Sequence, residues 1–175
     1  MEKRGEAIVL IGFMGSGKSS VGRELAARTR LPFYDTDRMV AARVGLTIAE
    51  IFTRDREEGF RAYETEALLQ VPRRPAIVVT GGGIVLRPEN VRTLRELGVV
   101  VHLTADDETL FERVSRRSTR PLLQTPDPRA RLTELRQLRA PFYRVAADVE
   151  VDTSQLSHQE VADAVLQAVE NLHVG

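Results

Sequence analysis

Short apolar runs alternate with longer stretches of helical periodicity along the whole chain. Five runs are rich in β-branched or aromatic residues, as buried parallel strands usually are: Ala7–Ile11, Leu31–Tyr34, Ala76–Thr80, Val99–Leu103 and Val149–Val151. Between and after them lie the expected helices: Lys18–Thr29, Arg38–Val44, Ile48–Arg54, Arg56–Gln70, Pro88–Leu97, Asp106–Ser115, Ala130–Tyr143 and His158–Leu172. This alternation predicts an α/β fold built from βαβ units around a parallel sheet.

One segment, residues 116–129, interrupts this rhythm. It is rich in Arg, Pro, Ser and Thr and shows no helical or strand period. Loops of this length inside a compact domain are usually functional lids or binding loops, and the alternative is a plain surface insertion. We expect a lid at approximately 116–129 within a single domain that spans residues 1–175.

Composition and charge narrow the range of functions. The formal net charge is zero, so the chain lacks the overall positive field that favours nucleic acid or an anionic membrane surface. It has no cysteine, which excludes disulfides and thiolate metal sites. Its histidines, His102, His158 and His173, are far apart, and we expect them at the surface or at strand ends. Without a signal pattern or an 18-residue apolar run, we expect a cytoplasmic, soluble protein.

The most specific motif follows the first strand. Residues 12–19 read Gly-x-x-x-x-Gly-Lys-Ser between a predicted strand and a predicted helix, the context of a phosphate-binding loop. Glycines allow successive backbone N–H groups to point into one concavity, and the helix N-terminus adds to it. Lys18 can reach the β- and γ-phosphates, and the Ser19 hydroxyl can bind Mg²⁺. The nucleotide-binding residues predicted here are Gly12, Met14, Gly15, Ser16, Gly17, Lys18, Ser19 and Ser20. A glycine-rich surface turn is the alternative.

Two carboxylates, Asp35 and Asp37, follow the second predicted strand. The carboxyl ends of parallel strands share one edge of the sheet, so both should face the phosphate loop. One can hold Mg²⁺ through water, and the other can accept a hydrogen bond from a substrate hydroxyl. Alternatively, Asp37 caps the N-terminus of the helix that begins at Arg38.

Three successive glycines, Gly81, Gly82 and Gly83, follow the third predicted strand. Such a run lets a ligand approach the backbone closely, although a tight turn could also require glycine. This strand does not end in an aspartate, so metal binding would fall to Ser19 and Asp35.

Three arginines are candidates for binding anions: Arg61 on a predicted amphipathic helix, Arg120 in the lid and Arg139 near a helix end. Each could form paired hydrogen bonds with a carboxylate or phosphate. A solvated surface charge is the commoner case for any single arginine, and spacing alone leaves both interpretations open.

Together these motifs resemble the shikimate kinase family of small P-loop kinases, related to the nucleoside-monophosphate kinases. The resemblance rests on Gly12–Ser19, Asp35-Thr36-Asp37, Phe60-Arg61 with Glu64, Gly81-Gly82-Gly83, and Arg120-Pro121-Leu122-Leu123 with Arg139-Ala140-Pro141-x-Tyr143. It implies a three-layer αβα P-loop kinase fold with a five-stranded parallel sheet and a lid. It also implies transfer of the γ-phosphate of MgATP to the 3-hydroxyl of shikimate, which gives shikimate 3-phosphate.

The resemblance also implies residue roles. Lys18 would contact the transferred phosphate, while Ser19 binds Mg²⁺ and Asp35 holds it through water. Asp37 would act as general base on the acceptor hydroxyl, and Arg120 would neutralise phosphate charge. The shikimate-binding residues would be Asp37, Arg61, Gly81, Gly82, Gly83 and Arg139.

Some expectations stay open. An arginine ahead of the lid would pack on adenine, and Arg113, Arg116 and Arg117 compete for this role, with an adenine loop near Asp152–Leu156. The alternatives are another small-metabolite kinase, such as a gluconate kinase-like protein, or a non-catalytic nucleotide-binding module. No long apolar seam is visible, so we expect a monomer.

Overall fold

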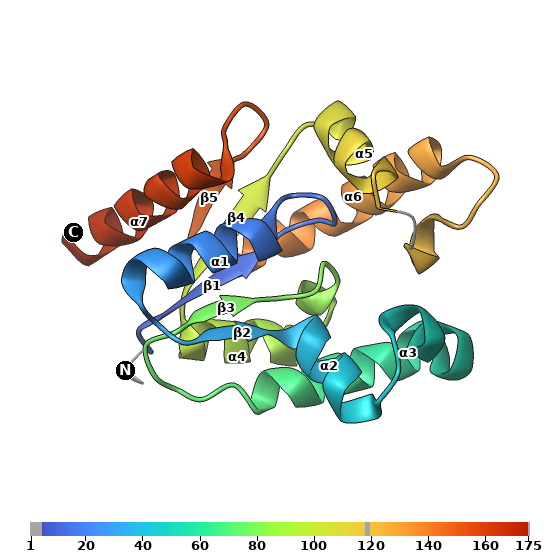
Figure 1. Cartoon of the computed structure of the whole chain (residues 1–175), viewed down its shortest axis with the longest axis horizontal. Helices are drawn as coiled ribbons and strands as arrows, with labels where there is room; N and C mark the ends of the chain where they lie inside the picture. The colour runs from blue at the N-terminus through green and yellow to red at the C-terminus, as the bar shows by residue number, and fades with distance from the viewer. Residues whose placement is uncertain (1–4, 118–119, 175) are drawn as a thin grey trace.

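All five predicted strands are present in one parallel sheet. The computed structural model describes residues 5–117 and 120–174 (Figure 1). The strand order is β2-β3-β1-β4-β5, with strands β1 (Ala7–Ile11), β2 (Phe33–Asp35), β3 (Ile77–Val79), β4 (Gly98–Thr104) and β5 (Val149–Asp152). In the register, Val9 of β1 lies opposite Val78 on one side and Val100 on the other. The central strand β1 therefore leads the phosphate loop to the middle of the sheet edge.

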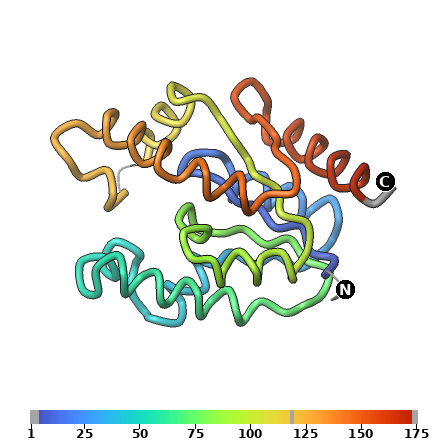
Figure 2. The backbone as a smooth tube through the Cα atoms, turned by 180° about the vertical axis from the view of Figure 1, so that it is seen from behind, coloured from blue at the N-terminus to red at the C-terminus, as the bar shows by residue number. Residues whose placement is uncertain are grey.

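Helices cover both faces of the sheet, which gives the predicted three layers (Figures 1 and 2). Helices α1 (Lys18–Thr29) and α7 (His158–Val174) pack on one face, where Leu25 and Val165 belong to the same buried cluster as Leu10 of β1. Helices α4 (Pro88–Leu97) and α6 (Pro128–Ala146) cover the other face, where Leu94 and Leu132 belong to the core around Val9. Alternate residues of β1 thus serve opposite cores, as the pleat of a buried strand requires.

Helices α2 (Thr36–Val44) and α3 (Ile48–Leu69) form an arm beside the sheet (Figure 1). A small core of their own holds them together, including Val40, Ile51 and Phe60. The sequence predicts two helices across residues 48–70, and α3 does change direction within this range. At Arg56 the backbone leaves the helical region, with φ 62° and ψ −177°. The arm carries Arg61 towards the carboxyl edge of the sheet.

Helix α5 (Asp107–Ser115) precedes the segment 116–129. The predicted irregular loop contains a short 3₁₀ turn, η2 (Pro121–Leu123), which Leu123 anchors in the core with 9% exposure. Ser118 and Thr119 lie outside the described residues. A second 3₁₀ turn, η1 (Ile84–Leu86), follows the triple glycine.

Several element boundaries differ from the expected ones by a few residues. Asp35 is the last residue of β2 instead of following it, and α6 extends past Tyr143 to Ala146 with Pro141 inside it. Gly98 ends α4 and also begins β4. A Cβ atom at Gly98 would lie 1.8 Å from the Ala7 carbonyl oxygen, so only glycine fits this junction. No helix among the described residues is long and apolar enough to span a membrane.

Candidate active site

The phosphate loop lies between β1 and α1, as the sequence predicts. Gly15 and Gly17 have φ of 81° and 93°, a region that other residues rarely adopt, and α1 begins directly after them at Lys18. The Lys18 Nζ donates hydrogen bonds to the carbonyl oxygens of Gly12 (2.7 Å) and Phe13 (3.0 Å). These bonds hold the ammonium group over the loop.

Burial and nearby positive charge lower the pKa of Lys18. Removal from water lowers its pKa to about 8, and Arg120 adds to this effect, while Asp37 and Asp35 act in the opposite direction. Lys18 therefore carries its charge below about pH 8 in the absence of bound phosphate.

The two aspartates take different structural roles. Asp35 caps α2, because its Oδ1 accepts a hydrogen bond of 3.2 Å from the Arg38 N–H. The alternative reading, in which Asp37 caps this helix, is therefore wrong, since Asp37 lies inside the first turn. Asp37 Oδ1 is buried and has no hydrogen-bond partner among the described residues. Burial and the charge of Asp35 raise the Asp37 pKa, as suits a proton acceptor.

The triple glycine packs against charged side chains. A Cβ on Gly81 would lie 2.3 Å from Glu64 Oε1 and 2.6 Å from Asp37 Oδ1. A Cβ on Gly83 would lie 2.2 Å from the Arg61 Cζ. A side chain at Gly81 or Gly83 would displace these groups, so close approach explains glycine at these two positions.

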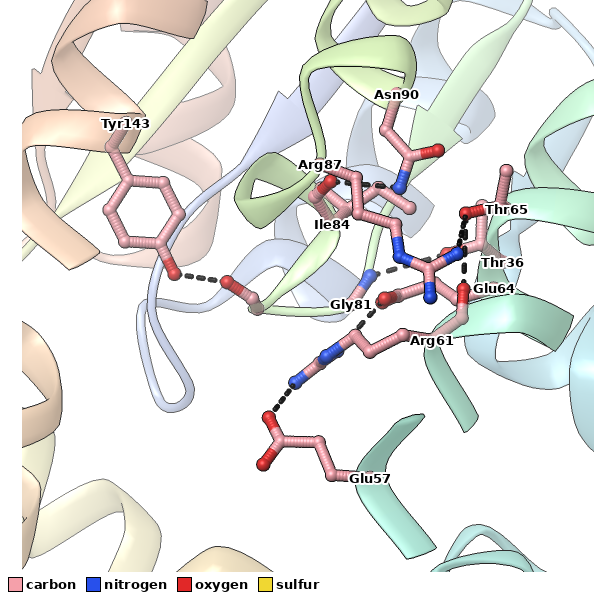
Figure 3. A network of polar contacts seen from close by, with 11 residues as sticks. Thr36, Glu57, Arg61, Glu64, Thr65, Gly81, Ile84, Arg87, Asn90 and Tyr143 are labelled. Carbon is pink, nitrogen blue, oxygen red and sulfur yellow. Dashed lines mark hydrogen bonds and ion pairs between the residues drawn. The ribbon is translucent and has the colours of Figure 1, made fainter. Parts of the chain in front are cut away.

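Arg61 is held by two carboxylates (Figure 3). Its Nη1 donates to Glu64 Oε2 at 2.8 Å, and its Nη2 donates to Glu57 Oε1 at 3.1 Å. Glu64 is fully buried, and burial raises its pKa to about 7 against the opposing effect of Arg61. Its Oε1 has no hydrogen-bond partner among the described residues. The sequence motif contains Glu64 but assigns it no role, although its i, i+3 spacing from Arg61 is one at which an ion pair can form.

Arg139 and Arg120 line the same small cavity as the triple glycine. Arg139 on α6 is 4% exposed, and its Nη1 lies near Gly82, 3.5 Å from where a Cβ would be. Arg120 directly precedes η2, and burial lowers its pKa. Neither side chain is the solvated surface charge that the sequence left open.

Two cavities meet at these residues. The larger, about 320 Å³, extends along the phosphate loop and α5. The smaller, about 70 Å³, lies between α3, α6 and the triple glycine. The residues that line both cavities are Met14, Asp37, Gly81, Gly82 and Arg120. Arg61, Gly83 and Arg139 line only the smaller cavity, and Lys18, Ser19, Ser20 and Asp35 only the larger one. Gly15 and Gly17 also line the larger cavity, whereas Gly12 and Ser16 are buried within the loop.

All three arginine candidates for the adenine contact line the larger cavity. Their side chains differ in their hydrogen-bond and ion-pair partners. Arg113 donates to the Gly15 carbonyl (3.2 Å) and to the Thr153 hydroxyl (2.9 Å), so it joins the phosphate loop to the predicted adenine loop. Arg116 instead pairs with exposed Glu112 on its own helix.

The histidines depart in part from expectation. His158 is exposed as predicted, yet it also lines the larger cavity, a placement that the sequence did not indicate. His102 is buried near the end of β4, where its ring stacks on Tyr143. The side chain of His173 lies outside the described residues.

Solved structures of known proteins share this fold. The solved structure of shikimate kinase from Acinetobacter baumannii in complex with shikimate has a TM-score of 0.91 and 34% identity, covering 99% of this chain and 97% of that chain. A gluconokinase from Sinorhizobium meliloti has a TM-score of 0.58 and 26% identity, covering 98% of each chain.

Comparison of sequences identifies the family more specifically than comparison of structures does. A shikimate kinase from Thioalkalivibrio sulfidiphilus is 46% identical over 159 residues, which cover 90% of this chain and 84% of the relative. The model of the family described as shikimate kinase matches residues 14–170. With this match over most of its length and a relative of this similarity, the chain belongs to the shikimate kinase family.

Proposed function

We propose that this protein transfers the γ-phosphate of ATP to the 3-hydroxyl of shikimate, giving shikimate 3-phosphate and ADP for aromatic amino acid biosynthesis. The observation that carries the proposal is the wall shared by the two cavities. Asp37 and Arg120 lie on this wall, between the phosphate loop and the smaller cavity. A phosphoryl group that passes from one cavity to the other must pass these two side chains.

The larger cavity would hold the nucleotide. Backbone N–H groups of the phosphate loop would surround the phosphates, with Lys18 at the transferred group and Arg120 above it. The glycine conformations and the direct start of α1 support this placement. The adenine would lie towards α5, where Arg113 is the best-held of the three candidates.

Oxygen donors suited to Mg²⁺ lie beside the phosphate loop. Ser19 would bind the ion directly and Asp35 through water, since both line the larger cavity. The Asp35 cap uses Oδ1, which leaves Oδ2 for a bound water. Within the described residues no group of three or more His, Cys, Asp or Glu could hold a metal, which suits an ion that takes most ligands from phosphate and water. Once bound, the ion would neutralise phosphate charge.

The smaller cavity would hold shikimate. Arg61 and Arg139 would bind its carboxylate, and Gly81, Gly82 and Gly83 would lie against its ring. The 3-hydroxyl oxygen would attack the γ-phosphorus as the bond to the β-phosphate oxygen breaks, and its proton would pass to Asp37 Oδ1. The unpartnered, buried state of this atom supports its role as acceptor.

An assay of ADP release with several acceptors tests the proposal. We expect rapid ADP release with shikimate and only background release with gluconate, with nucleoside monophosphates or with no acceptor. Faster release with gluconate would favour a gluconate kinase-like activity, and no release with any acceptor would favour a nucleotide-binding module. Release that does not depend on shikimate would also contradict the proposal.

We further propose that the protein works as a monomer in the cytoplasm, with ATP and shikimate as its partners and without nucleic acid or membrane. The zero formal net charge supports the last point.

A further inference from the structure

Tyr143 connects α6 to the triple glycine. Its side chain is 2% exposed, and its hydroxyl donates a hydrogen bond to the Gly82 carbonyl oxygen (Figure 3). Tyr143 follows Arg139 by four residues, so both side chains leave the same face of α6. One face of one helix therefore supplies an arginine of the smaller cavity and a hydrogen bond to the loop beside it.

The triple glycine needs such external anchors. Three successive glycines have wide backbone freedom and no side chains to restrict it. The Gly81 N–H donates to the Thr36 hydroxyl at 3.2 Å, and the Gly82 carbonyl accepts from Tyr143. The peptide unit that joins Gly82 to Gly83 is planar, so fixing its carbonyl also fixes the direction of the Gly83 N–H. Gly83 is the residue against which the Arg61 guanidinium packs.

The surroundings of Tyr143 keep its hydroxyl a donor. Burial raises its pKa to about 12, so the phenol stays protonated at working pH, although the positive charge of Arg139 acts against this. The His102 ring stacks on the phenol with centroids 4.7 Å apart and 17° between the planes. His102 is itself held by Glu150 Oε2 at 3.0 Å from its Nδ1. The ring thus has little freedom to turn its hydroxyl away from Gly82.

We propose that Tyr143 is a positioning residue for the acceptor carboxylate, which holds the Gly82 peptide and Arg139 at a fixed separation. Through Gly83, this hydrogen bond also sets the surface on which Arg61 rests. The two arginines then keep fixed positions on the wall of the cavity in which that carboxylate would lie. This inference rests on the proposed function, in which that carboxylate belongs to shikimate.

The variant Tyr143→Phe removes the hydroxyl and keeps the ring that stacks on His102. We expect the shikimate KM to rise roughly tenfold, because the Gly82 carbonyl loses its donor and the loop loses its anchor. The KM for ATP and kcat should each stay within about twofold, since the phosphate loop does not depend on this bond. The matched control is Tyr63→Phe, which removes a hydroxyl bonded to Arg54 on the arm and should leave all three constants within about twofold.

A purely structural role predicts a different pattern. An equal rise in KM for ATP and for shikimate would overturn the inference. So would a lower melting temperature with unchanged KM values and kcat. A shikimate analogue with a carboxamide in place of the carboxylate should bind the wild type more weakly than shikimate does. Its KM should also rise less than the shikimate KM when Tyr143 is replaced by phenylalanine. An equal loss for both acceptors would show that Tyr143 does not act on the carboxylate.

Two further readouts separate possible failures. If the wild type does not phosphorylate shikimate, the proposed function fails; if it does and Tyr143→Phe leaves the shikimate KM unchanged, only this inference fails. Should the variant not fold, 3-fluorotyrosine labelling of the wild type gives three ¹⁹F signals, one for each tyrosine. Shikimate should shift the buried Tyr143 signal and leave the Tyr34 signal in place, and an unmoved Tyr143 signal would overturn the inference.

Discussion

Lys18 illustrates how burial tunes a single residue for its ligand. Its ammonium group lies over the phosphate loop, and its pKa is lowered to about 8 by burial and by Arg120. A lysine is charged below its pKa, so the free enzyme should lose this charge as the pH rises through about 8. Bound phosphates would favour the charged form and raise the pKa again.

We therefore expect kcat/KM for ATP to fall above about pH 8, while kcat falls only at higher pH. Initial rates over a range of ATP concentrations and pH values would measure both profiles. In Lys18→Arg the guanidinium stays charged in this range, so the fall in kcat/KM near pH 8 should disappear. A fall that persists in this variant would assign the titration to another group.

Asp37 has a buried oxygen without a hydrogen-bond partner among the described residues, and the proposed function makes this atom the proton acceptor. Replacement by asparagine keeps the size of the side chain and removes its basicity. We expect Asp37→Asn to lower kcat by about 100- to 10,000-fold. The dissociation constant of ATP, measured by calorimetry, should change less than threefold. A kcat within tenfold of the wild type would mean that Asp37 is not the general base.

For single residues, the sequence predicts which side chains lie at the site better than it predicts their hydrogen-bond partners. The position of Asp37 beyond a strand was enough to place its carboxylate at the site, but not to decide which aspartate caps α2. That choice depends on where α2 begins, and it begins at Thr36, two residues before the predicted Arg38, so the cap is Asp35. The Tyr143 bond to Gly82 joins residues 61 positions apart, and no local pattern predicts such a pair.

Among the elements, α3 contains the strongest departure from regular geometry. Arg56 has φ 62° and ψ −177°, a combination that is costly for any residue except glycine. The residue is exposed, so its side chain contributes little packing. The strain persists because the arm must turn before it presents Arg61.

We expect Arg56→Gly to raise the free energy of unfolding by about 1 kcal/mol, since glycine adopts this conformation without strain. Urea denaturation followed by circular dichroism would measure the change. The control is Glu58→Gly, an exposed position with helical geometry in the same helix, which should be destabilised by about 1 kcal/mol. Destabilisation of both variants to the same extent would contradict the strain at Arg56.

Elements were predictable where the apolar pattern and the end signals agreed. Helices α3 and α4 begin at Ile48 and Pro88 as predicted, and a capping box of Thr47 and Glu50 precedes the first of them. The segment 116–129 was less predictable, because the 3₁₀ turn at its centre depends on burial of Leu123. That burial is a tertiary contact, and it leaves no period in the sequence.

For the whole molecule, the site divides between two sides of the sheet edge. The phosphate loop and α5 form the larger cavity, and the arm and α6 form the smaller one. The two halves meet only along a shared wall. Substitutions that touch one cavity alone should therefore affect one substrate alone.

Arg139 lines only the smaller cavity. We expect Arg139→Ala to raise the shikimate KM on the order of a hundredfold, because a carboxylate loses a buried charge partner. The KM for ATP should change by less than about twofold. Arg144→Ala, an exposed arginine on the same helix, should leave both constants unchanged. Equal loss of ATP and shikimate binding would show that the cavities are not independent.

Gly98 lies at the amino end of the sheet, away from the edge that carries the site. With a Cβ only 1.8 Å from the Ala7 carbonyl, any other residue here would force β1 and β4 apart. Strand β1 continues from Ala7 to Ile11 and enters the phosphate loop at Gly12. Judged only by its distance from the site, Gly98 would be expected to tolerate substitution. Substitution of Gly98 should nevertheless inactivate the enzyme, because a displaced β1 would also displace the phosphate loop that follows it.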